Sequence, residues 1–104
     1  MSILGDWILV EKKKECSDSH RFSHGHIGRV GEISQCAEKC RAMSSMFIFG
    51  TNEFEYEDHH GKRCDEKGCD CWCETAATSY GNCVTEEHKG YNLYKFVNWV
   101  SPGK

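Results

Sequence analysis

Short apolar runs separated by polar segments dominate the chain, and their lengths predict a domain built largely of β-strands. Strand-like runs, rich in β-branched and aromatic residues, occur at residues 7–12, 46–50, 71–74 and 91–97. Residues 54–57 alternate apolar and charged side chains, which is typical of an edge or hairpin strand. A further short strand is compatible with residues 27–30.

One segment, residues 34–43, has the period of a helix. Cys36, Cys40 and Met43 recur about one turn apart, and strong helix formers fill the positions between them. Ser34 is the expected N-cap, because its hydroxyl can accept a hydrogen bond from an unpaired backbone N–H. One helix among four or five strands predicts an α+β domain.

The cysteine content changes this picture most. Eight cysteines in 104 residues are typical of a secreted domain held together by disulfides. Zinc is the competing explanation, but structural zinc sites usually use C-x2-C pairs, and the chain has none. The alternating triplet Cys69, Cys71 and Cys73 suits one face of a strand instead. We therefore expect four disulfides, no metal or other cofactor, and an extracellular location.

Geometry narrows the pairing of these cysteines. Cys36 and Cys40 are one helical turn apart, about 6 Å along the axis. Cys71 and Cys73 are about 6.5–7 Å apart on one face of a strand. Two parallel disulfides between the helix and the strand therefore fit, with Cys69 in place of Cys73 as the rival register.

Two further pairs follow from position along the chain. Cys16, after the first strand, and Cys83, before the last, would join the two terminal strands. Cys64 and Cys69 would close a local loop.

Four stretches of sequence occur in a characteristic order: Trp7-Ile8-Leu9-Val10 followed by Cys16, Gln35-Cys36-Ala37-Glu38-Lys39-Cys40, Phe47-Ile48-Phe49-Gly50, and Cys71-Trp72-Cys73-Glu74 with Tyr91-Asn92-Leu93-Tyr94-Lys95-Phe96. Together they resemble the PAN/apple superfamily. The resemblance covers residues 7–97, which we take as a single domain with terminal extensions at 1–6 and 98–104. It implies one α-helix packed on a curved antiparallel β-sheet.

The resemblance also implies a Cys36–Cys71 disulfide and, as in apple-type members, a Cys16–Cys83 disulfide. Many members of the superfamily carry a cysteine about six residues after the second helix cysteine and bonded back to it, but here that position is Met46. Cys40 therefore needs another partner, and Cys73 is the natural one. The Cys64–Cys69 pair is an addition to the family pattern.

Catalysis, nucleic-acid binding and a membrane span are not indicated. A nucleophilic cysteine needs a free thiolate and a nearby base, whereas all cysteines here are expected to be oxidised. The motifs G-x-S-x-G, H-E-x-x-H and a Gly-rich phosphate loop are missing from the sequence. The net charge is −3, and the one basic run, Lys12-Lys13-Lys14, is better explained as a solvated edge. No apolar stretch approaches the roughly 20 residues that span a bilayer.

Two groups of side chains could bind metals, but each has a simpler explanation. His24 and His26 are weak candidates for a transition-metal site, and solvated loop histidines are the favoured alternative. The acidic residues among positions 53–58 could ligate calcium, but an acidic strand edge that discourages strand pairing is favoured.

Aromatic side chains are better candidates for function. Trp72 is expected to point away from the helix, because its two neighbouring cysteines point toward it. Exposure is expected for Tyr56, Tyr80, Tyr91 and Trp99, and exposed aromatics suit both sugar rings and protein contacts. We expect the binding surface to lie within residues 56–63 and 75–82. The expected contact residues are Tyr56, Asp58, His59, Lys62, Arg63 and Tyr80.

These observations favour a non-enzymatic extracellular recognition module for a protein or a glycan, the contacts that PAN/apple-like domains mediate. One alternative is a structural or adhesive secreted matrix component that self-associates. Another is a secreted inhibitor or toxin-like effector.

Overall fold

The structure of the protein is a computed structural model that describes residues 6–17, 25–51 and 63–100. Within these residues the chain forms six strands and one helix. In chain order they are β1 (Trp7–Cys16), β2 (His26–Val30), α1 (Ile33–Cys40), β3 (Met46–Gly50), β4 (Cys64–Asp65), β5 (Gly68–Cys73) and β6 (Thr85–Phe96).

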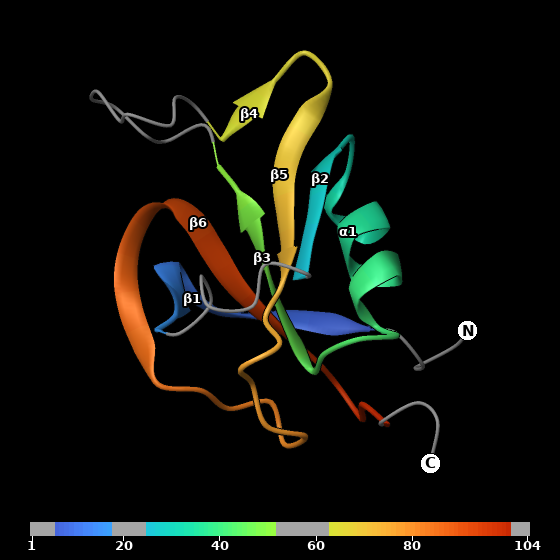
Figure 1. The fold of residues 1–104 in the computed structure, drawn as a ribbon, viewed down its shortest axis with the longest axis vertical. Helices are drawn as coiled ribbons and strands as arrows, with labels where there is room; N and C mark the ends of the chain where they lie inside the picture. The colour runs from blue at the N-terminus through green and yellow to red at the C-terminus, as the bar shows by residue number, and fades with distance from the viewer. Residues whose placement is uncertain (1–5, 18–24, 52–62, 101–104) are drawn as a thin grey trace.

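The strands form one antiparallel sheet in the order β1-β6-β3-β5-β2, and β4 pairs with the start of β5. Figure 1 shows that the sheet is strongly curved, with β6 bending round to follow β1, while α1 stands beside β2 and β5. The predicted small disulfide-rich fold with one helix and an antiparallel sheet is confirmed. Strand makes up far more of the molecule than helix.

The ribbon formed by β1 and β6 is longer than the sequence pattern predicts. Both strands continue through charged residues until Cys16 pairs with Thr85 at the far end. Two register shifts interrupt the pairing, and Lys13, at the second of them, has a φ of 60°. Polar residues on both faces leave no apolar alternation, so this part of the ribbon carries no strand signal in the sequence.

The helix begins earlier than predicted. Its N-cap is Glu32 and not Ser34, so the predicted cap is wrong. Gln35 Oε1 accepts a hydrogen bond from the Glu32 backbone N–H at 2.9 Å, and the Glu32 side chain accepts one from the Gln35 N–H. This capping box satisfies two backbone N–H groups at once, and a serine hydroxyl at position 34 would satisfy only one.

The first hydrophobic core lies between α1 and the sheet. Phe47 is fully buried at its centre, with its ring centroid 5.2 Å from those of both Tyr94 and Phe96. Trp7 approaches the same ring edge-on at 6.4 Å. From the helix and β5, the buried members of this core are Cys36, Ala37, Cys40, Cys71 and Cys73.

The second core lies on the opposite face of the sheet. It consists of Cys16, Met46, Ile48, Tyr91 and Leu93. Trp72 packs against this core, which confirms that its side chain points away from the helix. Ala77 and Cys83 pack here too, so the chain that follows β5 is attached to this second core.

The domain contains four disulfides, and no cysteine is free. The pairs are those predicted from the sequence: Cys16–Cys83, Cys36–Cys71, Cys40–Cys73 and Cys64–Cys69. The two bonds between α1 and β5 have Cα separations of 5.6 and 5.1 Å, within the ordinary range for a disulfide. The helix is therefore attached to the sheet at two successive turns.

The chain beyond residue 97 also contacts the body of the domain. Trp99 packs against the first core, and its indole Nε1–H donates a hydrogen bond to the carbonyl of Arg41 at 2.9 Å. Structure thus continues into the segment that the sequence assigns to a terminal extension.

Truncating the central aromatic ring should be costly. We expect Phe47→Ala to lower the free energy of unfolding by about 3–5 kcal/mol, because a fully buried phenyl ring leaves a cavity between helix and sheet. Urea denaturation with the disulfides intact measures this change. Val100→Ala, at a side chain 74% exposed, is the control and should change stability by less than about 0.5 kcal/mol. A loss below 1 kcal/mol for Phe47→Ala, roughly the size of an average substitution, would contradict the assigned core.

Candidate functional site

Two of the six predicted contact residues, Arg63 and Tyr80, belong to the described part of the chain. They lie at opposite ends of the sheet (Figure 1): Arg63 adjoins the start of β5, where its carbonyl accepts a hydrogen bond from the Asp70 N–H at 2.7 Å, and residues 75–82 follow the end of β5. Arg63 and Tyr80, the two predicted contacts within the described residues, therefore do not lie side by side. The other four predicted contacts lie outside the described residues; they are Tyr56, Asp58, His59 and Lys62. The weak metal candidate His24 lies outside them too.

Residues 75–82, which we call the Tyr80 loop, present an aromatic side chain to solvent. Tyr80 is 84% exposed, as predicted. The Thr78 hydroxyl oxygen accepts hydrogen bonds from the backbone N–H groups of Tyr80 and Asn82, each at 3.3 Å. The Thr78 N–H donates to the Asn82 carbonyl at 2.8 Å, and Gly81 adopts the left-handed conformation with a φ of 78°. The loop backbone is thus fixed by its own hydrogen bonds while its largest side chain contacts water.

Two buried serines hold the Tyr80 loop against the sheet. The Ser45 hydroxyl donates to the Thr78 carbonyl, and the Ser44 hydroxyl donates to the Glu74 carbonyl. The Glu74 carbonyl also accepts from the Ala77 N–H at 3.0 Å. These contacts connect the loop to the residues that lead into β3.

A single residue of β1, Cys16, holds both ends of the Tyr80 loop. Just before the loop, the Glu74 side chain accepts a hydrogen bond from the Cys16 backbone N–H at 2.7 Å. Just after the loop, Cys83 forms its disulfide with Cys16. The loop therefore begins and ends at the same point of the β1–β6 ribbon, which gives Tyr80 a rigid base.

Glu74 is an unusual group to find at this base. The residue is 0% exposed, and its Oε1 atom has no hydrogen-bond partner among the described residues. Burial, opposed by the Cys16 N–H and reinforced by the nearby Glu86 charge, raises the pKa of the Glu74 carboxyl to about 7. The carboxyl beneath the loop consequently keeps its proton to a higher pH than an exposed glutamate does.

A polar network occupies the other end of the sheet and centres on Asp70. Tyr91 Oη donates to Asp70 Oδ2 at 2.7 Å, Trp72 Nε1 donates to the same oxygen at 3.1 Å, and His26 Nε2 lies 3.0 Å from Oδ1. Burial acts to raise the pKa of the Asp70 carboxyl, but these hydrogen bonds from Tyr91, His26 and Trp72 hold it below its ordinary value. Asp70 is therefore ionised and ties β2, β5 and β6 together.

Tyr91 corrects one expectation from the sequence. The prediction that it is exposed is wrong: it is 3% exposed, because its ring packs in the second core and its hydroxyl is hydrogen-bonded to Asp70. The Arg63 guanidinium lies 5.3 Å from the centre of this ring, and Arg63 Nη2 lies 3.5 Å from His88 Nε2. The contacts of Arg63 are thus with the domain itself.

The helix side of the molecule has a cavity of about 500 Å³ between α1 and the β4–β5 turn. Its lining is mainly polar and charged: Arg29, Val30, Gly31, Gln35, Glu38, Lys39 and Lys67. Arg29 Nη1 lies 3.6 Å from the carboxylate of Asp65, and Glu38 adds a negative charge to the lining. Charges of both signs therefore meet there, and no single ligand chemistry is favoured.

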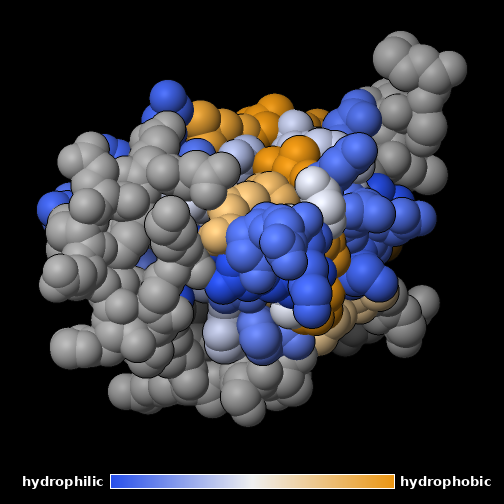
Figure 2. Space-filling view, turned by 90° about the horizontal axis from the view of Figure 1, so that it is seen from above, coloured by the Kyte–Doolittle hydropathy of each residue, from blue (hydrophilic) through white to orange (hydrophobic). Residues whose placement is uncertain are grey.

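The molecule seen from above shows hydrophobic residues as separate areas between hydrophilic ones (Figure 2).

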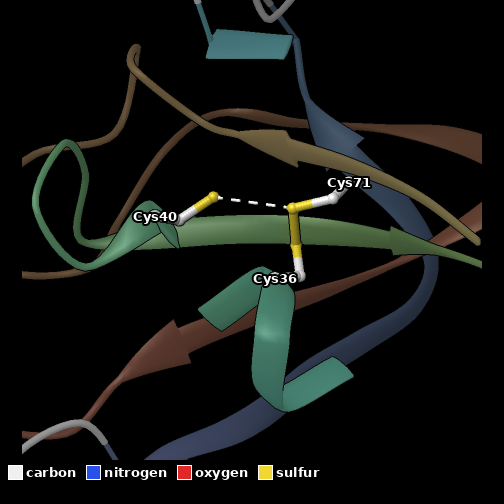
Figure 3. Close-up of side chains that lie close together, drawn as sticks. All are labelled: Cys36, Cys40 and Cys71. Atoms are coloured by element: carbon white, nitrogen blue, oxygen red, sulfur yellow. Dashed lines mark hydrogen bonds between the residues drawn. A yellow bond between two sulfur atoms is a disulfide. The ribbon is translucent and has the colours of Figure 1, made fainter. Parts of the chain in front are cut away.

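One group of described side chains has the spacing of metal ligands, and disulfides account for it. The sulfur atoms of Cys36, Cys40 and Cys71 lie within 4.8 Å of one another (Figure 3). Cys36 is bonded to Cys71, and Cys40 Sγ, itself bonded to Cys73, lies 3.8 Å from Cys71 Sγ. Metal ligation requires thiolates, so these oxidised sulfurs are structural. His26 is the other weak metal candidate. Its Nε2 lies 3.0 Å from Asp70 Oδ1, and its ring centroid lies 4.2 Å from that of Trp72.

Comparisons with models of known protein families, with curated proteins and with solved structures find no match for this chain. The one helix of the described residues is too short and too polar to cross a bilayer.

Removing the hydroxyl that organises the Tyr80 loop should loosen its tip. We expect Thr78→Val to reduce the protection of the Tyr80 and Asn82 amides against hydrogen exchange, because both lose their acceptor. The global free energy of unfolding should fall by only about 1 kcal/mol. Ser79→Ala in the same turn is the control and should leave exchange unchanged. Equal protection in Thr78→Val and the wild type would show that the hydroxyl does not order the loop.

Proposed function

We propose that the protein is a non-enzymatic extracellular recognition module of the PAN/apple type, and that the Tyr80 loop is the element that contacts its partner. The observation that carries this proposal is Tyr80 itself, 84% exposed on a loop whose backbone is fixed. An aromatic side chain that stands in water buries no apolar surface, so this position of Tyr80 adds nothing to the hydrophobic stability of the domain. A binding role accounts for the exposure of Tyr80.

Rigidity makes this exposed side chain suited to binding. Ordering a loop on association costs free energy, and a loop already fixed by Thr78 and by both bonds to Cys16 avoids most of that cost. Tyrosine also has few rotatable bonds for the area it covers, which is why it is frequent among residues that dominate binding energy.

The surroundings of Tyr80 favour a protein partner over a glycan. Residues 75–83 carry no charged side chain. Val84, directly after Cys83, is 77% exposed, so a second apolar side chain stands on the same segment. Apolar and aromatic side chains without charges are typical of the centre of a protein interface.

The disulfides and the fold support the remaining parts of the proposal. Several disulfides in a small domain are typical of extracellular proteins, where the bonds persist. The Cys36–Cys71 and Cys16–Cys83 bonds, with one helix packed on an antiparallel sheet, are the features that the resemblance to PAN/apple domains implies.

A self-associating adhesive component is the second candidate, and one observation favours it. β1 is an edge strand of the sheet, and it exposes three consecutive apolar side chains, Ile8, Leu9 and Val10, to 48, 44 and 42%. The two register shifts of β1 and the charged Lys12–Lys14 run oppose strand pairing with a second copy. Sedimentation at increasing concentration separates the candidates: a strict monomer counts against self-association.

Substituting Tyr80 tests the recognition proposal. The wild-type protein is applied to arrays of extracellular proteins and of glycans, and each hit is measured again with Tyr80→Ala. We expect Kd to rise about 30-fold or more, the change produced by losing about 2 kcal/mol at a dominant contact. Val100→Ala, which also shortens an exposed apolar side chain, should leave Kd within about twofold. Equal binding by wild type and Tyr80→Ala, or no binding on either array, would count against the proposal.

A further inference from the structure

We infer that the Glu74 side chain makes the anchoring of the Tyr80 loop dependent on pH, so that the loop is held most firmly when this carboxyl is protonated. The anchoring device itself depends only on the geometry around Glu74. Its consequence for binding rests on the proposed function of the Tyr80 loop.

Few groups around Glu74 can stabilise its ionised carboxylate. Glu74 is completely buried, and one backbone N–H, that of Cys16, donates to Oε2. Oε1 and the neighbouring Thr75 hydroxyl are both buried without a hydrogen-bond partner among the described residues. A buried carboxylate needs several donors or a cation to offset its loss of water, whereas the neutral acid needs much less.

The charged groups nearby do not supply that support. β6 contributes the Glu86 carboxylate, whose charge disfavours ionisation of Glu74. β1 contributes the buried Glu15, next to Cys16, and Lys14, whose ammonium lies 4.0 Å from Glu11. β2 contributes His26, which is paired with Asp70.

The other elements around Glu74 are uncharged. The residues at the start of β3 that contact Glu74 are Ser44 and Met46, and residues 75–83 carry no charge. Among the described residues, therefore, the one charged side chain that acts on the Glu74 carboxyl is Glu86, and together with burial it favours the neutral form against the single Cys16 N–H.

Opening the base of the loop exposes the Glu74 carboxyl to water and so removes the cost of ionising it in a buried position. When residues 75–82 lift away from the ribbon, water reaches Glu74 and its pKa returns toward the ordinary value of 4.5, from about 7 in the closed loop. A group that binds its proton more tightly in the closed state stabilises that state at low pH, and this stability is lost as the pH rises from 4.5 to 7. Above this range the loss is complete and stability becomes constant.

Hydrogen exchange of the loop amides measures the effect without any ligand. After correction for the intrinsic exchange rate, we expect the opening constant of residues 75–82 to rise about tenfold per pH unit between about pH 5 and 7, and to level off above that range. In Glu74→Gln, which keeps an acceptor for the Cys16 N–H but cannot ionise, the opening constant should be flat across this range.

Two further variants sharpen the assignment. Glu86→Gln removes the neighbouring charge and should move the levelling-off to lower pH. Glu66→Gln, in the exposed β4–β5 turn, removes an equal charge far from the loop and should leave the profile unchanged. If Glu74→Gln does not fold, carbon NMR of the Glu74 carboxyl in the wild type gives its titration midpoint directly.

A titration midpoint below pH 5, or the same pH profile in Glu74→Gln as in the wild type, would overturn the inference. Binding measurements keep the two proposals separate. If Tyr80→Ala abolishes binding while loop opening is independent of pH, the recognition function stands and the pH device fails. If the opening follows the expected profile and Tyr80→Ala binds normally, the device stands and the function fails.

Discussion

The pair of disulfides between α1 and β5 fixes most of the architecture. One turn of helix and two residues of strand advance by similar distances, so Cys36 and Cys40 can bond to Cys71 and Cys73 without distortion. Once those two strand residues face the helix, the pleat requires Asp70 and Trp72 to face the other way. The packing of Trp72 against the second core and the position of Asp70 in its polar network thus follow from the pairing.

The parts of the fold that could be predicted are those in which periodicity and cysteine spacing agree. The helix, the buried strand β3 and the direction of Trp72 all follow from repeats of 3.6 or 2.0 residues combined with the disulfide geometry. The extension of β1 to Cys16 was missed, because charged residues occupy both of its faces. The helix start was misplaced because a Glu32–Gln35 capping box competes with the simpler serine cap.

The candidate site was predictable only in part. Tyr80 could be assigned to an exposed turn from the small polar residues around it. Glu74 could not be recognised, because a glutamate after a strand is ordinarily solvated and nothing in the sequence shows that Cys16 donates to it. The sequence likewise predicts Arg63 and Tyr80 as contacts with one partner, but Arg63 adjoins the start of β5 and Tyr80 follows its end. Such relations arise between residues distant in sequence, which is where local pattern has least power.

The Cys16–Cys83 disulfide has a consequence beyond anchoring a loop. It joins two residues 67 positions apart, and the other three disulfides all lie within the ring of chain that it closes. A single cut of the backbone anywhere between these two cysteines therefore opens the ring without dividing the molecule. The product is two polypeptide segments that the Cys16–Cys83 disulfide still joins in one covalent molecule. A first cleavage within this ring therefore releases no fragment, and the two segments stay at the high local concentration that favours keeping the fold.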